Sequence, residues 1–176
     1  MKNKTLIAVF IAALTLISCK DEKVKEAPAP KVDDSFYITF NLVVQKNDNF
    51  QIYYNEDASD SFPPDQYVDV AVKGSEQPQE ITFKLPDNAL PASLRFDLGN
   101  NKEQGEIKIN DFKMKYHDKA FSAPAISFIN YFWNTDQIEY NKEKAIAKPK
   151  TTGDAPYDPI FLATELLKIE LKKITR

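Results

Sequence analysis

The chain of 176 residues has only one cysteine, one histidine and four glycines. One cysteine cannot form a disulfide within the chain or a multi-thiolate metal site. His117 has no second histidine with which to share a metal ion, and neither a glycine-rich phosphate loop nor a G-x-S-x-G nucleophile elbow occurs. The sequence therefore predicts no cofactor, no metal ion and no catalytic residues, and we expect a protein that is not an enzyme.

An excess of charge of one sign is also absent. The 23 basic residues are interleaved with 26 acidic ones, giving a net charge of −3, so we expect no basic surface and no nucleic-acid partner. Asp57, Asp60 and Asp65 lack the regular alternation and the glycine of a calcium-binding EF-hand loop. Acid pairs such as Glu103 and Glu106 arise by chance in a chain with 28% charged residues, so they do not indicate a glycosidase.

No apolar run is long enough to span a membrane. The run near the N-terminus, Leu6 to Ile17, has 12 residues, whereas a spanning helix needs about 20. Lys2 and Lys4 precede it, and a positive start followed by a short apolar run is typical of a secretory signal peptide.

Leu16, Ile17 and Ser18 lead directly into Cys19, and this pattern resembles the lipobox of bacterial lipoproteins. The resemblance implies that residues 1–18 are a cleaved signal peptide. It also implies that the Cys19 thiol is acylated, with palmitate or a similar chain, and that the freed amino group takes a further chain. Several acyl chains anchor a protein stably, because each buried CH₂ contributes about 0.8 kcal/mol. We therefore expect the membrane as one partner.

The residues after Cys19 bear on where the anchored protein resides. Lys20, Asp21 and Glu22 resemble the signal that exports some lipoproteins to the outer face of the outer membrane; the alternative is a solvated charged linker. We expect an outer-membrane protein facing the cell surface, with the periplasmic face as the alternative. Residues 19–34 contain prolines, alanines and charges and are typical of an extended tether.

A single domain is expected over residues 35–176, and it is rich in period-two alternation. The alternation predicts strands with these inward side chains: Phe36, Ile38, Phe40, Leu42 and Val44; Phe50, Ile52 and Tyr54; Val68, Val70 and Val72; Ile81, Phe83 and Leu85; Leu94, Phe96 and Leu98. In the next strand Ile107 and Ile109 differ in parity from Phe112 and Met114, which predicts a bulge at residues 110–111. Short strands without intervening helices indicate an all-β protein with an antiparallel β-sandwich.

The C-terminal part is less regular. Strand-like composition predicts further strands over residues 125–133, 137–140 and 144–148, and an apolar run follows the turn at residues 154–159. Leu167, Leu171 and Ile174 fit helical spacing, although Leu167, Ile169 and Leu171 also fit a strand. The Glu, Leu and Lys content favours a short helix capped by Thr164.

The segment "SLRFDLGNNKEQGEIKINDFKMKY" resembles the closing strands of galactose-binding-like jelly rolls, the fold of many carbohydrate-binding modules. The resemblance covers about half of the domain. It rests on Arg95, Asp97, Gly99, Ile107, Ile109, Asn110 and Asp111. It implies a jelly-roll sandwich that binds a ligand without altering it.

Sugar binding needs an aromatic face together with amides or carboxylates that bond hydroxyl groups. On a strand, Tyr131 and Trp133 would face the same way, and the alternative is that Trp133 is an ordinary core residue. Tyr53 and Tyr67, on outer faces, are second candidates for stacking. The candidate ligand-binding residues are Asn130, Tyr131, Trp133, Asn134, Asp136, Tyr53 and Tyr67.

These observations lead to two functional hypotheses. The first is a lipid-anchored β-sandwich that binds a glycan or another extracellular polymer without catalysis. The alternative is a protein-interaction or structural subunit of a cell-envelope complex, in which the same aromatic surface docks a protein partner.

Overall fold

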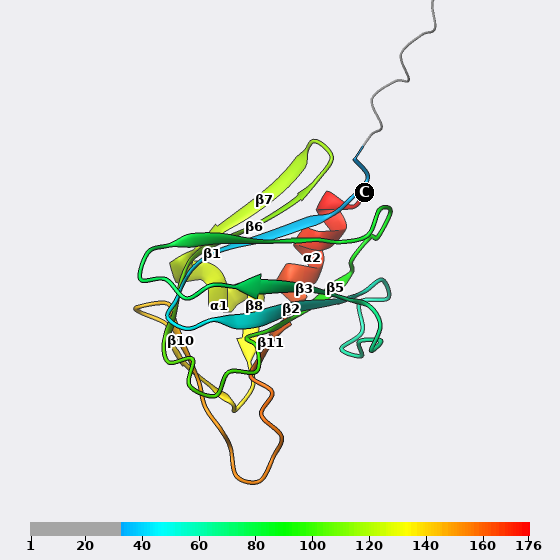
Figure 1. Ribbon diagram of the computed structural model, residues 1–176. Helices are drawn as coiled ribbons and strands as arrows, with labels where there is room; N and C mark the ends of the chain where they lie inside the picture. The colour runs from blue at the N-terminus through cyan, green and yellow to red at the C-terminus, as the bar shows by residue number, and fades with distance from the viewer. Residues whose placement is uncertain (1–32) are drawn as a thin grey trace, which may run out of the picture. The chain divides into compact units, whose positions relative to one another are not determined.

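A computed structural model describes residues 33–176 of the chain, and these form a sandwich of two antiparallel sheets (Figure 1). The predicted all-β sandwich is confirmed. The predicted signal peptide, Cys19 and most of the expected tether lie outside the described residues. Within residues 33–176, no helix is both long and apolar enough to cross a membrane.

Each sheet has a central set of long strands and shorter strands at one side. The first sheet contains, in spatial order, β4 (Gln79–Lys84), β1 (Tyr37–Val44), β6 (Ile107–Tyr116), β10 (Ile146–Pro149) and β9 (Ile138–Asn141), with β7 (Lys119–Pro124) also paired to β6. The second contains β3 (Tyr67–Val72), β2 (Asp48–Asn55), β5 (Ser93–Asp97), β11 (Ile160–Ala163) and β8 (Phe132–Asn134).

The connections between strands repeatedly cross from one sheet to the other. The chain changes sheet seven times: between β1 and β2, β3 and β4, β4 and β5, β5 and β6, β7 and β8, β8 and β9, and β10 and β11. As a result, the order β4, β1, β6, β10 in one sheet matches the order β3, β2, β5, β11 in the other. Two antiparallel sheets joined by such crossings form a β-sandwich.

The core between the sheets is built from phenylalanines on the inward faces. Phe40 of β1 and Phe96 of β5 stack with ring centroids 4.2 Å apart at 10°. The alternating inward residues of β1, β2, β4, β5 and β6 are buried, as their pattern predicts. Each buried phenylalanine contributes about 1.5–3 kcal/mol of transfer free energy, so this packing fixes which face of every strand points to solvent.

The bulge predicted in β6 is confirmed. Asn41 of β1 pairs with Asp111, but Leu42 pairs with Ile109, so Asn110 is the extra residue. Ile109 and Phe112 are both buried. The bulge therefore keeps both halves of the strand facing the core.

The strand predicted over residues 125–133 is wrong for most of its length. A 3₁₀ turn, η1 (Ala125–Ser127), and one helical turn, α1 (Phe128–Tyr131), precede the short strand β8. Phe128 and Phe132 are buried while Asn130 is exposed. A continuous strand would place Asn130 in the core between the two rings, and burying an unpaired amide is unfavourable.

The chain ends in the helix α2 (Glu165–Ile174), as the helical alternative predicts. The Thr164 hydroxyl accepts a hydrogen bond from the Leu167 backbone N–H at 3.4 Å, which confirms the expected cap. Leu167, Leu171 and Ile174 are buried, and the helix packs against β5, β7 and β11.

Candidate functional site

A row of side chains crosses the outer face of the second sheet. Tyr67 of β3 pairs with Tyr53 of β2, Tyr53 with Arg95 of β5, Arg95 with Leu162 of β11, and Leu162 with Trp133 of β8. Directly paired residues project from the same face of a sheet. With strands about 4.8 Å apart, the row extends over roughly 19 Å. We call these five residues the aromatic row.

The core packing explains why the aromatic row faces outward. In β2, the buried side chains of Ile52 and Tyr54 flank Tyr53, so alternation turns Tyr53 to the opposite face. In β8, Phe132 is fully buried and the next residue, Trp133, is 45% exposed. Tyr67, on the edge strand, is 38% exposed. The alternative that Trp133 is a core residue is therefore wrong.

Aromatic and cationic groups hold one another in place at one end of the row. The rings of Tyr53 and Tyr67 stack with centroids 5.0 Å apart at 28°. The guanidinium carbon of Arg95 lies 4.9 Å from the centroid of the Tyr53 ring, within cation–π range. Burial, and then the nearby Asp97 carboxylate, raise the pKa of Tyr53, so its phenol stays neutral and able to donate a hydrogen bond.

Arg95 is clamped by two carboxylates. Its Nε donates to Asp97 Oδ1 at 2.8 Å and its Nη2 to Asp97 Oδ2 at 2.7 Å. Nη2 also donates to Asp158 at 2.9 and 3.1 Å. Bidentate pairing fixes the plane of the guanidinium. Burial raises the pKa of Asp97 to about 6 against the opposing effect of Arg95, and the negative charge of Asp158 raises it further.

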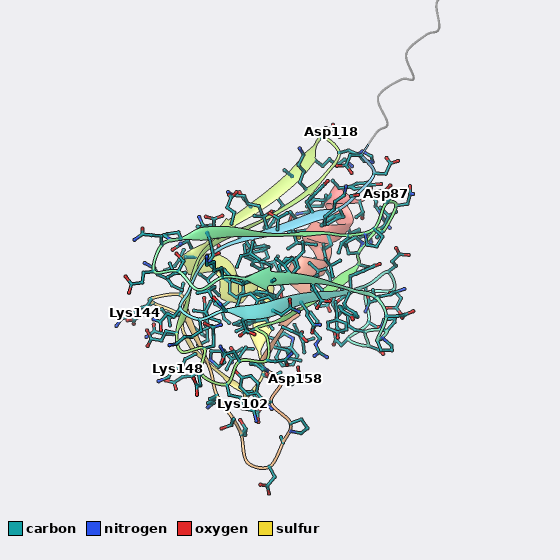
Figure 2. All side chains as sticks on the ribbon, in the orientation of Figure 1. Asp87, Lys102, Asp118, Lys144, Lys148 and Asp158 are labelled. Carbon is teal, nitrogen blue, oxygen red and sulfur yellow. The ribbon has the colours of Figure 1, made fainter. Side chains whose placement is uncertain are left out.

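The loop that supplies Asp158 is anchored by the buried amide of Gln137. Gln137 Nε2 donates to the Pro156 carbonyl at 2.8 Å, and Gln137 Oε1 accepts from the Asp158 N–H at 2.7 Å. The Lys150 N–H donates to the Gln137 carbonyl at 2.8 Å. This loop, orange in Figure 1, runs past the ends of the sheets, and Figure 2 shows Asp158 where it returns. Gln137 thus fixes the approach of Asp158 to Arg95.

A second row, beside the first, supplies hydrogen-bonding groups. Gln51 pairs with Asp69 on one side and Asp97 on the other, and Asp97 pairs with Ile160. Asp69 Oδ1 accepts from Asn49 Nδ2 at 2.9 Å and from Gln51 Nε2 at 2.7 Å. One exposed face therefore combines aromatic rings with planar amides and carboxylates.

Tyr131 does not belong to this face. It ends the helical turn α1, and its ring packs against Phe112 and Phe121 with centroid separations of 5.6 and 5.1 Å. The expectation that Tyr131 and Trp133 face the same way is wrong, because the strand begins only at Phe132 and parity does not extend back into the helix.

The three predicted polar partners of Trp133 are not gathered around it. Asn134 Nδ2 donates to the carbonyls of Thr135 and Ile138 at 3.0 and 2.8 Å, so it organises the β8–β9 turn. Asn130 and Asp136 are exposed, and their backbone carbonyls accept hydrogen bonds from threonine hydroxyls. Neither side chain takes part in a row on the second sheet.

Several residues of the site were not predicted from the sequence. In the sequence, Arg95 and Asp97 carry only the resemblance to galactose-binding-like domains; in the structure they form an ion pair, with Nη2 of Arg95 2.7 Å from Oδ2 of Asp97. Gln51, Asp69 and Asp158 carry no local signal for a site. Alternation places Gln51 on the face of Tyr53 and Asp69 on the face of Tyr67, but it does not indicate a site. Asp158 lies in a loop, and its approach to Arg95 depends on contacts distant in the sequence.

The outer face of the first sheet has a different character. A groove of about 670 Å³ lies over β1, β4, β6 and β7, lined in part by Tyr37, Thr39 and Lys113. Of its two lysines, Lys113 is already paired, because Lys113 Nζ lies 3.1 Å from Glu80 Oε1. Thr39 and Thr82 share a hydrogen bond of 2.9 Å. This groove lacks a second aromatic ring stacked on Tyr37, so the aromatic row is the stronger candidate.

Within residues 33–176, no group of His, Cys, Asp and Glu side chains is arranged to hold a metal ion. His117 lies in the turn between β6 and β7, with Nε2 3.6 Å from Asp34 Oδ1.

No protein-family model, no curated protein and no solved structure matches this chain. The resemblance of residues 93–116 to galactose-binding-like domains therefore stays a prediction. The geometry of the second sheet is what indicates a function for this domain.

Proposed function

We propose that this domain binds a glycan or another extracellular polymer without altering it, through the aromatic row. The observation that carries the proposal is the strand register, which brings Tyr67, Tyr53 and Trp133 to one exposed face. Aromatic faces stack on the apolar side of sugar rings, and neighbouring amides and carboxylates bond their hydroxyls. Gln51 and Asp69 supply such groups beside the row.

The arrangement of the acids favours binding over hydrolysis. Asp97 and Asp158 both hold Arg95, so neither is free to transfer a proton to a ligand. Glycoside hydrolysis needs two carboxyl groups on opposite sides of the scissile bond, whereas these two converge on one guanidinium.

The location of the protein forms part of the proposal. Acylated at Cys19, the domain would be held at the outer membrane, facing the cell surface or, alternatively, the periplasm. Metabolic labelling with a palmitate analogue tests the anchor: the wild-type protein should be labelled and Cys19→Ser should not. Protease treatment of intact cells distinguishes the two faces, because only a surface-exposed domain is degraded.

Binding is tested by the fluorescence of Trp133, the single tryptophan of the chain. Titration with a ligand polysaccharide should shift its emission in a saturable way. Tyr53→Ala should weaken binding at least about tenfold, which equals a loss of about 1.4 kcal/mol. Ile126→Ala is a matched control, since Ile126 is a 71% exposed apolar residue in η1, off the row. Equal affinities of the two variants would contradict the proposal.

The second candidate function is a protein-interaction or structural role in an envelope complex. It is favoured by the composition of the row, because Trp, Tyr and Arg are the residues most often found at the energetic centres of protein interfaces. Crosslinking from a photoreactive residue at position 67, followed by mass spectrometry, discriminates between the two functions. A single protein adduct together with a blank polysaccharide screen would establish the interaction role.

A further inference from the structure

The second sheet presents more negative than positive charge around the aromatic row. The two rows and the adjoining loop contribute the carboxylates of Asp69, Asp97 and Asp158 and the single cation Arg95. With all three acids ionised, two negative charges remain uncompensated. The face therefore has an electrostatic preference of its own, in addition to its aromatic character.

The one cation of the face is already engaged. Arg95 forms charge-assisted hydrogen bonds with both Asp97 and Asp158, and its guanidinium covers the Tyr53 ring. A carboxylate or sulfate on a ligand would have to displace Asp97 or Asp158 to reach it. Displacing Asp97 would leave a buried carboxylate without its partner, which is strongly unfavourable. Displacing the half-exposed Asp158 would place its negative charge beside that of the ligand.

The acids at the surface of the face are acceptors that point to solvent. The side chain of Asp158 is 50% exposed. Asp69 is also exposed, and only its Oδ1 receives hydrogen bonds from the described residues, from Asn49 and Gln51. An ionised carboxylate accepts hydrogen bonds and cannot donate them. Hydroxyl groups of a sugar satisfy such oxygens, whereas acidic groups are repelled by them.

The length of the row sets a further requirement. Tyr53 and Trp133 are separated by three strand spacings, roughly 14 Å, with Arg95 and Leu162 between them. One sugar ring cannot stack on both aromatic side chains. Contact with both needs a chain of several sugars lying across the strands.

On the basis of the proposed function, we infer that the ligand is a polysaccharide without acidic groups, bound as a chain across β2, β5, β11 and β8. Polymers bearing uronate or sulfate groups are disfavoured by Asp69 and Asp158. Monosaccharides bind weakly because they engage only one aromatic group.

The test compares neutral polysaccharides with carboxylated derivatives of the same backbones, with Trp133 emission as the readout. The carboxylated form should bind at least about threefold more weakly than the neutral form at low salt, the effect expected of two exposed charges. This difference in affinity should become smaller as the salt concentration rises. The double variant Asp69→Asn, Asp158→Asn should also reduce the difference in affinity, and Asp69→Asn alone should reduce it in part. Asp118→Asn should leave it unchanged, because Asp118 lies in the β6–β7 turn, far from Asp158 (Figure 2).

The outcomes separate this inference from the proposed function. Equal or tighter binding of the carboxylated polymers, still lost in Tyr53→Ala, overturns the inference and leaves the proposed function standing. Full affinity for a monosaccharide overturns the chain-length requirement. Failure of every neutral and acidic polymer to bind overturns both.

Discussion

Substitution of Gly99 by alanine tests the geometry that holds the end of β5, and with it Asp97, in place. Gly99 follows β5 by two residues and has a φ of +82°, a conformation that costs an alanine about 1–2 kcal/mol. A Cβ at this position would lie 2.2 Å from Asp48 Oδ1. The Asp48 carboxylate would therefore have to move.

The Asp48 carboxylate organises the loop after Gly99. Its Oδ1 accepts from the backbone N–H groups of Asn49, Asn100 and Asn101 at 2.9, 3.0 and 3.3 Å. Its Oδ2 accepts from Gln104 Nε2 at 3.0 Å. Losing two of these bonds removes about 2 kcal/mol. With the backbone term, Gly99→Ala should lower the free energy of unfolding by about 3–4 kcal/mol.

Gly153→Ala is the matched control for this prediction. Gly153 also has a positive φ, +52°, but nothing lies within 4 Å of its added Cβ. It should lose only the backbone term, about 1 kcal/mol. Urea denaturation followed by Trp133 emission measures both variants. If the free energy of unfolding falls by the same amount in both variants, within about 0.5 kcal/mol, the hydrogen bonds of the Asp48 carboxylate do not contribute to stability and the prediction is wrong.

Three further predictions concern single side chains. The folded-state pKa of Asp97, about 6, exceeds its ordinary value of 3.8, so the folded protein binds the proton of this carboxyl group more tightly than the unfolded protein does. The free energy of unfolding should therefore fall by up to about 3 kcal/mol as the pH rises from 4 to 6. Asp97→Asn should remove that slope in denaturation at a series of pH values, and a carboxyl pKa below 4 by NMR would contradict it. Tyr140→Phe should leave stability unchanged or raise it by about 1 kcal/mol, because the Tyr140 hydroxyl is buried without a hydrogen-bond partner in residues 33–176 and burial raises its pKa to about 12; a thermal melt showing a clear loss would reveal an unrecognised partner. Thr164→Ala should cost about 1–2 kcal/mol through loss of the cap on α2 and of the hydrogen bond from the Thr164 hydroxyl to the Asn130 carbonyl, while Thr164→Ser, which keeps both, should not; equal unfolding midpoints for the two variants would contradict this role of the hydroxyl.

The strands β1 to β6 were predictable because apolar residues alternate with polar ones in each of them, even in β5, whose polar side is largely buried. Their alternation is a local property, and even the bulge at Asn110 left a visible change of parity. The helix α2 was predictable for the same reason, since its apolar residues repeat at helical spacing behind a threonine cap.

The structure of residues 125–133 was predicted wrongly because their apolar residues fit both the period of a strand and the period of a helix. Phe128 and Phe132 lie on one side of a strand and also on one side of a helical turn. Only the exposure of Asn130 distinguishes the two, and exposure depends on packing against the other sheet.

The site was predictable in its parts and not in its assembly. The outward faces of Tyr53 and Tyr67 follow from alternation within β2 and β3. Their alignment with Arg95 and Trp133 depends on pairing between strands distant in the sequence, which no local pattern encodes. The role of Asp158 depends on a loop held by Gln137, and that contact is equally non-local.

The most direct test of the central claim is a titration of Trp133 emission with neutral polysaccharides, comparing the wild-type protein with Tyr53→Ala and Ile126→Ala. If the aromatic row is a glycan-binding surface, one or more polymers will shift the emission saturably, Tyr53→Ala will bind at least about tenfold more weakly, and Ile126→Ala will match the wild type. An emission that no polymer shifts, or a shift that Tyr53→Ala leaves intact, would contradict the claim.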